Sequence, residues 1–333
     1  MALRTILADP MLRMLALATA LAAIVPVTGS GRDIAQIVAN CAVFLLFLLN
    51  GLRIACSEIM RGISHWRYQA VLVVWVFGAM ALGGLALSLA GEAFLPALIA
   101  LGFLYLGVLP STVQSATSYT ALSGGAVALA VVSAALLNIL GVFVSVPLFL
   151  ALGGSGEGAV GNEVLVKILG ILVLPFALGQ LFQKPAAPLI ESIRTKIAWV
   201  DRFVIAIAVY VAFSGAVEQG IWSRVDGAGW LILLAFVALF LAFAHGGAYL
   251  AAKFAGFARE DRIAFLFSGA QKSAAVGAPL ATILFPPEVA GFIVLPLLLY
   301  HLFQLVLAAP LASRLSAWPL PDGDDCSAPT TRS

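Results

Sequence analysis

Charged side chains are scarce in this chain of 333 residues. Asp, Glu, Lys and Arg make up 10% of the residues, hydrophobic residues make up 62%, and the mean hydropathy is +1.07. Soluble domains carry roughly a quarter charged residues, so the composition excludes an ordinary soluble domain and predicts a chain embedded in a lipid bilayer. The net charge is only +2 and no basic patch is present, which excludes nucleic acid as a partner.

Cysteine is also rare. Cys41, Cys56 and Cys326 have no metal-ligand spacing and no even pairing, which argues against disulfides and structural zinc. No Asp or Glu lies in the middle of any long apolar run, and no nucleophile stands in a pattern with a base. We therefore expect no carboxylate relay, no metal site and no enzyme activity.

Long apolar runs dominate the remaining sequence. Ten of them are long enough to cross roughly 30 Å of hydrocarbon. They lie near 11–28, 34–51, 69–90, 95–122, 126–151, 163–183, 198–217, 227–252, 262–285 and 289–313. The first run follows Arg4 and Arg13, but it has no obvious small-residue cleavage site, so we interpret it as a helix and not as a signal peptide.

The basic residues predict the orientation of these spans. Ten spans place both termini on one side of the membrane, and fourteen of the eighteen basic residues fall on that side. Three lie opposite and Lys272 lies inside a span. Because Lys and Arg accumulate in cytoplasmic loops, we predict a multi-pass protein of the plasma (inner) membrane with both termini in the cytoplasm. Residues 1–318 form a single membrane unit, and the polar residues 319–333 are expected to be a disordered cytoplasmic tail.

Two predicted spans are interrupted at corresponding places in the two halves of the chain. In span four, Gly107 and Pro110 interrupt the helix, and a polar run follows at residues 111–118. In span nine, a polar run at residues 268–273 precedes Pro279. Five spans per half turn the halves in opposite directions through the membrane, so this pattern is typical of an inverted repeat with broken helices near the midplane. Lipid cannot hydrogen-bond freed backbone groups, so we expect a polar cavity where these helices cross.

Lys272 stands near the middle of span nine. Its ammonium is roughly 15 Å from either surface, too far for easy snorkelling, and must face a polar interior. One interpretation is a structural lysine that bonds carbonyls freed by the helix break. The other is an anion-binding or coupling group, which the usual functional role of intramembrane charges favours.

Polar residues around both breaks complete the predicted substrate or ion site. The run after Pro110 begins a half-helix, whose N–H groups and dipole attract anions. The alternative is that its Ser and Thr side chains bond back to carbonyls one turn earlier, and that Asn138 makes an interhelical bond. The candidates are Ser111, Thr112, Gln114, Ser115, Thr117, Ser133, Asn138, Ser268, Gln271, Lys272 and Ser273.

Other polar residues in the spans are predicted to have structural roles. His245, His301 and Gln304 are interpreted as helix-packing contacts. Asp201 and Arg202 are interpreted as a cap and an interface anchor at the start of span seven.

Several stretches spread over most of the chain are specific as strings. They are FLLNGLR, LPSTVQSATSYTALSGGAVALAVVSAALLNILGVF, LPFALGQLFQ, DRFVIAIAVYVAFSGAVEQGIW and FLFSGAQKSAAVGAPLATILF. In these stretches the chain resembles the bile acid:sodium symporter family, in its bacterial branch of sodium-dependent transporters. The resemblance implies an all-α fold of ten transmembrane helices in two five-helix inverted repeats, with helices four and nine broken and crossed. It also implies a panel domain at about 11–51 and 163–217, a core domain at about 69–151 and 227–313, and an alternating-access cycle.

The resemblance also places the site and reveals a departure. The family's ion and substrate region falls on Ser111 to Ser118 and near Ala130 to Ala134. On helix nine, the members that carry bile acids have a sodium-binding Glu where this chain has Ser268 and a Gln where it has Lys272. The missing carboxylate weakens both sodium sites, and the ammonium repels a nearby cation. No cofactor is therefore predicted, with a sodium ion left open as an alternative.

Our hypothesis from the sequence is a secondary transporter of a small organic anion. Lys272 and the half-helix after Pro110 form the anion site, and the lysine stands in for a coupling cation, with proton coupling left open. The alternative is a membrane protein of transporter fold with a regulatory or scaffold role and no transport. The predicted partners are the solute and the bilayer; the oligomeric state is not predicted.

Overall fold

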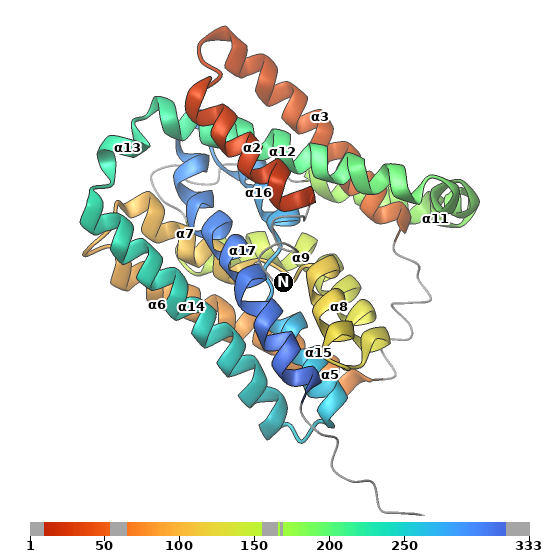
Figure 1. Cartoon of the computed structure of the whole chain (residues 1–333). Helices are drawn as coiled ribbons and strands as arrows, with labels where there is room; N and C mark the ends of the chain where they lie inside the picture. The colour runs from red at the N-terminus through yellow and green to blue at the C-terminus, as the bar shows by residue number, and fades with distance from the viewer. Residues whose placement is uncertain (1–9, 54–64, 155–165, 167–168, 318–333) are drawn as a thin grey trace, which may run out of the picture.

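The computed structural model describes residues 10–53, 65–154, 166 and 169–317. Within these ranges every regular element is a helix (Figure 1). The α-helices are α2 (Pro10–Ile24), α3 (Ser30–Arg53), α5 (Trp66–Val74), α6 (Met80–Gly91), α7 (Ala97–Val108), α8 (Val113–Leu122), α9 (Val127–Ala151), α11 (Leu174–Ser192), α12 (Arg194–Glu218), α13 (Ile221–Arg224), α14 (Gly227–Phe254), α15 (Arg259–Ala270), α16 (Ala274–Leu284) and α17 (Pro287–Ser316). Two π-helical segments, η1 (Trp75–Ala79) and η2 (Leu169–Val173), continue into α6 and α11.

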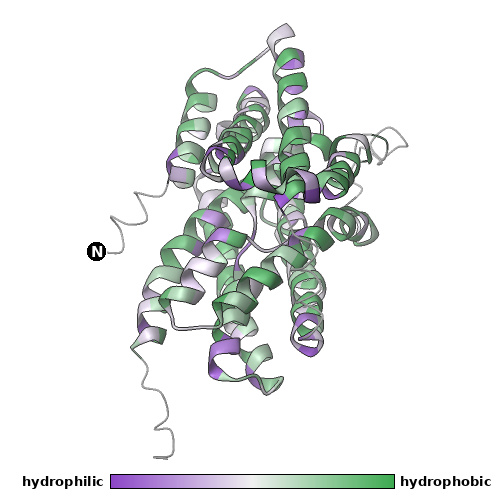
Figure 2. Ribbon diagram, turned by 90° about the vertical axis from the view of Figure 1, so that its right-hand side faces the viewer, coloured by the Kyte–Doolittle hydropathy of each residue, from purple (hydrophilic) through white to green (hydrophobic). Residues whose placement is uncertain are grey.

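The helices are long and apolar enough for a multi-pass membrane protein. Seven continuous helical segments in the described residues meet the length and hydropathy of a membrane span, and an eighth does if the pair α7 and α8, bent by 62°, is one span. Figure 2 shows hydrophobic residues over most of the helical surface and hydrophilic residues at several helix ends. A helical membrane protein is therefore the observed class.

The predicted ten spans and inverted repeat stay a prediction. In the described residues α2 has 15 residues, and span nine is divided into α15 and α16, with 12 and 11 residues, so each piece is short for a span. Span six begins within residues outside the described ranges. The predicted tail at 319–333 lies wholly outside them.

The helices pack in two groups. The helices α2, α3, α11 and α12 contact one another and are called the panel helices below. The helices α5 to α9 and α14 to α17 are called the core helices, and among them α16 and α17 contact the panel helices. The division of the chain into a panel domain and a core domain stays a prediction.

Glycine allows the closest helix contacts within each group. A Cβ atom on Gly84 of α6 would overlap the Phe103 carbonyl oxygen of α7, and one on Gly51 of α3 would overlap the Phe176 carbonyl oxygen of α11. Small residues let helix backbones approach in membranes, where dispersion replaces the hydrophobic effect between helices.

The predicted cap at Asp201 is wrong. Helix α12 begins at Arg194, so Asp201 lies inside the helix and not at its start. Its two oxygens accept hydrogen bonds from Arg53 of α3, with N to O distances of 2.6 Å and 3.1 Å. The helix starts earlier because residues 194–200 contain no Pro or Gly that would end it. Arg202 lies over the Trp199 ring, 4.9 Å from its centroid.

Candidate functional site

Spans four and nine are both interrupted, and the two breaks lie side by side. The backbone is non-helical between α7 and α8 and again between α15 and α16. The Ser273 N–H in one break donates to the Pro110 carbonyl oxygen in the other at 3.1 Å. The Tyr105 hydroxyl of α7 donates to the Gly277 carbonyl oxygen of α16 at 2.6 Å. The sequence predicted these two breaks and their proximity.

Local chemistry explains where the helices stop and restart. Pro110 has no N–H for the carbonyl one turn earlier, and Leu109 before it is extended, with φ −73° and ψ 149°. Thr112 and Ser273 are the N-cap residues of the half-helices that follow. The Thr112 hydroxyl accepts from the Ser115 N–H at 3.3 Å, and the Ser273 hydroxyl accepts from the Val276 N–H at 3.2 Å.

The Lys272 side chain crosses from one break to the other. It is fully buried, and its Nζ donates to the carbonyl oxygens of Gly107 at 2.8 Å and Leu109 at 2.7 Å. A third carbonyl oxygen, that of Val76 in the π-helical segment η1, lies at 3.5 Å. No acidic side chain of the described residues forms an ion pair with it. Three acceptors match an ammonium, which has three N–H donors and no acceptor.

These contacts resemble the structural alternative, in which the lysine bonds backbone carbonyl oxygens, and the anion-binding or coupling role stays a prediction. The carbonyls that it bonds belong mainly to the end of α7, where the helix dipole is negative, and not to the break in its own span. The ammonium therefore occupies a position where backbone oxygens of two irregular segments converge. The same carbonyl oxygens could coordinate a free cation.

Helix α17 supports the break that carries Lys272. The Gln304 amide accepts from the Lys272 N–H at 2.7 Å and donates to the Lys272 carbonyl oxygen at 3.0 Å. The Tyr300 hydroxyl donates to the Ala270 carbonyl oxygen at 2.7 Å, and His301 Nδ1 lies 3.3 Å from the Lys272 carbonyl oxygen. One face of α17 thus satisfies backbone groups that the missing helix turn leaves open. His301 and Gln304 are packing contacts, as predicted, but they also shape the site.

Helix α9 supports the other break in the same way. The Asn138 amide donates to the Ser111 carbonyl oxygen at 3.0 Å and to the Ala134 carbonyl oxygen at 2.7 Å. The Ser145 hydroxyl donates to the Val108 carbonyl oxygen at 2.8 Å. The predicted interhelical bond of Asn138 is present.

Replacing Asn138 by Leu is expected to destabilise the fold by about 1–3 kcal/mol, because a buried carbonyl oxygen of the break loses its donor. The measurement is the thermal unfolding midpoint of the purified protein. Ser313→Ala is the matched control, because its hydroxyl bonds the Ala309 carbonyl on an exposed helix face. Equal midpoints for the two variants would contradict a supporting role for Asn138.

The remaining candidates are divided between the crossing and its surroundings. The Ser115 hydroxyl donates to Gln271 Oε1 at 3.0 Å, so these residues join the two breaks directly. Ser268 is fully buried one turn before the break, and its hydroxyl has no hydrogen-bond partner among the described residues. In the same part of the chain the Gln271 Nε2 also lacks a partner. The site therefore retains unused polar atoms.

Three candidates lie apart from the direct contacts between the breaks. Thr117 donates back to the Val113 carbonyl oxygen at 2.8 Å, which is the alternative that we raised for hydroxyls in this helix. Ser133 of α9 accepts from Gln69 of α5 at 3.0 Å. Gln114 is exposed on α8.

Sequence reasoning missed two parts of the site. Gln69 is a polar residue at the start of a predicted span, so a signal for it was present. The Val76 carbonyl oxygen has no sequence signal, because its availability follows from the π-helical segment. Within the described ranges no group of three or more His, Cys, Asp or Glu side chains could hold a metal ion.

The multi-pass helical fold and the paired helix breaks are features of secondary transporters as a class. Comparison of sequences identifies the family. The chain belongs to the SBF-like CPA transporter family, whose model matches residues 9–317. The resemblance to sodium and bile acid symporters is thereby confirmed.

Relatives in the family cover nearly the whole chain. An uncharacterized protein of Pseudomonas aeruginosa, PA2026, is 37% identical over 88% of this chain and 89% of its own length. The Escherichia coli protein named "Putative symporter YfeH" is 35% identical over 92% of both chains. Sodium/bile acid cotransporter 7 of Rattus norvegicus is 24% identical over 84% of both chains.

Proposed function

We propose that this chain is a secondary transporter of a small organic anion that works by alternating access. The observation that carries the proposal is the buried Lys272 side chain, whose Nζ bonds the Gly107 and Leu109 carbonyl oxygens with no acidic partner in the described residues. We propose that this group carries its positive charge. An uncompensated charge deep in a membrane protein is costly to keep and is usually functional. We assign it the place of a coupling cation.

The half-helix α8 is the proposed receptor for the anion. It begins at the break beside Lys272, and the first turn of a helix offers N–H groups and positive dipole to an anion. Gln114 in that turn is exposed, and Ser115 reaches the other break. Relatives named as sodium/bile acid cotransporters support the solute class, because bile acids are organic anions.

The residues at the crossing do not fit sodium. The position aligned by resemblance with a sodium-binding Glu is Ser268, which has no charge, and Lys272 Nζ takes the carbonyl oxygens that would coordinate a cation. Hard cations bind through oxygen ligands and are repelled by an ammonium. We also propose the plasma membrane as the location, with both termini in the cytoplasm, from the distribution of Lys and Arg.

The test begins with a screen of organic anions for an increase in the thermal unfolding midpoint, since a bound solute stabilises the folded state. Uptake of each stabilising anion into proteoliposomes is then measured with sodium and proton gradients imposed separately. We expect uptake that does not need sodium. A regulatory or scaffold protein without transport predicts that no solute stabilises the chain, and uptake that depends strictly on sodium would contradict the assigned role of Lys272.

A further inference from the structure

One face of the molecule has an ion pair between the panel and core helices. Arg32 at the start of α3 pairs with Glu218 at the end of α12 and with Glu288 at the start of α17. Its Nη1 lies 2.6 Å from Glu288 Oε1. Arg32 and Glu218 belong to panel helices, whereas Glu288 belongs to a core helix. We call the helix ends that carry these three residues the Arg32 face.

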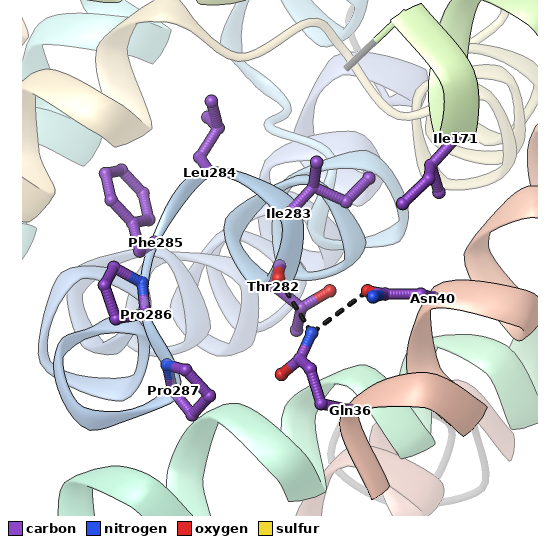
Figure 3. Close-up of a pocket in the computed structure, with 9 residues that line it drawn as sticks. All are labelled: Gln36, Asn40, Ile171, Thr282, Ile283, Leu284, Phe285, Pro286 and Pro287. Carbon is purple, nitrogen blue, oxygen red and sulfur yellow. Dashed lines mark hydrogen bonds between the residues drawn. The ribbon is translucent and has the colours of Figure 1, made fainter. Parts of the chain in front are cut away.

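A second polar contact joins the same two groups one helical turn deeper. Gln36 of α3 donates to the Thr282 carbonyl oxygen of α16 at 2.9 Å and to Asn40 Oδ1 at 3.0 Å (Figure 3). Gln36 lies four residues after Arg32, so both side chains are on one side of α3. Gln36, Asn40 and Thr282 also line a partly open cavity of about 260 Å³, whose lining includes the buried side chain of Leu284. The polar contacts therefore lie at a cavity on the boundary between panel and core helices.

Glycines bring the two groups into direct backbone contact at this face. A Cβ atom on Gly215 of α12 would overlap the Pro287 carbonyl oxygen of α17, and one on Gly291 of α17 would overlap the Ala212 carbonyl oxygen. No side chain could be inserted at either position without separating the helices. The boundary is closed at the Arg32 face.

The two half-helices that follow the breaks differ in their surroundings. Helix α16, on the Arg32 side of the crossing, is almost wholly buried and packs against panel helices α3 and α12 as well as α17. Helix α8 packs against α9, α15 and α17, which are all core helices. Its polar residues Gln114 and Ser118 are exposed at one-turn spacing. The half-helix α8 is thus partly exposed, whereas α16 is covered.

We propose that Arg32, Glu288 and the contact of Gln36 with Thr282 form a gate that holds panel and core helices together at the Arg32 face while α8 is accessible from the opposite face. Opening this gate uncovers α16, and the same relative movement covers α8. The gate rests on the proposed alternating-access function, since it defines one of its two states. It assigns positioning roles to Arg32, Gln36 and Glu288, none of which contacts the crossing.

The experiment measures thiol labelling at both half-helices. Reporter thiols are introduced separately by Leu284→Cys, in the cavity beneath the gate, and Ser118→Cys, on the exposed side of α8. Purified protein in lipid nanodiscs exposes both faces to the same maleimide solution, so sidedness does not matter. The background replaces the natural cysteines by Ser at Cys41, Cys56 and Cys326.

Glu288→Gln is expected to raise the labelling rate of the Leu284→Cys reporter and to lower that of the Ser118→Cys reporter. The rise should be about twofold to fivefold, as expected when one partly exposed ion pair is lost from a two-state equilibrium. The fall should be smaller, because the state with α8 accessible holds most of the population before the change. Exchanging the charges with Arg32→Glu and Glu288→Arg should restore slow labelling at Leu284→Cys when Glu218→Gln is added, because that change removes the like charge beside residue 32. Glu92→Gln, at an exposed glutamate that forms no ion pair within the described ranges, is the matched control and should change neither rate.

Two results would overturn the gate. Unchanged rates at both reporters would show that the ion pair does not hold the boundary closed. A faster rate at Leu284→Cys alone would show local loosening with no coupled movement of α8. Size-exclusion profiles and unfolding midpoints identify variants that fail to fold. If Glu288→Gln fails to fold, the labelling rates of the charge-exchange variant test the gate. Since no solute is added, the result does not depend on which anion, if any, is carried.

Discussion

Lys272→Gln is expected to fold but to lose most anion transport. The Gln amide keeps N–H donors near the carbonyl oxygens of Gly107 and Leu109, but it removes the positive charge. A unit charge acting over about 8 Å at an effective dielectric constant of about 20 changes a binding free energy by about 2 kcal/mol, about thirtyfold in affinity. Anion affinity from the stabilisation screen and anion uptake into proteoliposomes should both fall by about thirtyfold.

Lys272→Met separates the charge from the hydrogen bonds. The Met side chain is similar in length and offers no donor, so each stranded carbonyl oxygen should cost about 1–3 kcal/mol of folding stability. Lys272→Gln should therefore unfold at a higher temperature than Lys272→Met, while neither transports at the normal rate. Normal affinity and uptake in Lys272→Gln would remove the charge from the mechanism and leave Lys272 with a structural role only.

Gln304→Leu is expected to reduce stability more than any variant at the crossing that removes a single hydrogen bond. The Gln304 amide satisfies both the N–H and the carbonyl oxygen of Lys272. Leaving both groups unsatisfied in the buried site should cost roughly 2–6 kcal/mol, from about 1–3 kcal/mol for each. Thermal unfolding measures the loss, and hydrogen exchange of the amides at 270–273 should quicken.

Tyr300→Phe is the matched comparison for Gln304→Leu. It lies one turn earlier on the same face of α17 and removes a single hydrogen bond, to the Ala270 carbonyl oxygen. Its cost should be about 1–3 kcal/mol, the penalty for one unsatisfied group. A Gln304→Leu variant that is as stable as the parent chain would show that water or another side chain replaces the amide.

The sequence was enough to predict the membrane spans that the structure describes and both helix interruptions. Long apolar runs and their lengths determine where helices can lie in lipid, while Pro110 and the polar run around Lys272 mark local defects. Such features are local, so they can be interpreted without a fold. Asn138 as an interhelical bond follows from the same reasoning, because an isolated amide in an apolar span needs a partner.

Contacts between residues far apart in the chain could not be predicted in the same way. Lys272 bonds Gly107 and Leu109, more than 160 residues earlier, and the pairing of Arg32 with Glu288 joins residues 256 apart. Which acceptors a buried lysine meets depends on how the helices pack. The start of α12 was misjudged because the residues before Asp201 carry several polar side chains, yet they continue the helix.

The covalent attachment of the Lys272 ammonium has a thermodynamic consequence. A free ion at the crossing would be taken from one compartment and released to the other, and its gradient would do work on the solute in each turnover. A charge that belongs to the polypeptide returns with it and links to no such gradient. To concentrate its solute through this position, the chain must exchange the lysine proton between compartments; otherwise it equilibrates the solute according to concentration and membrane potential.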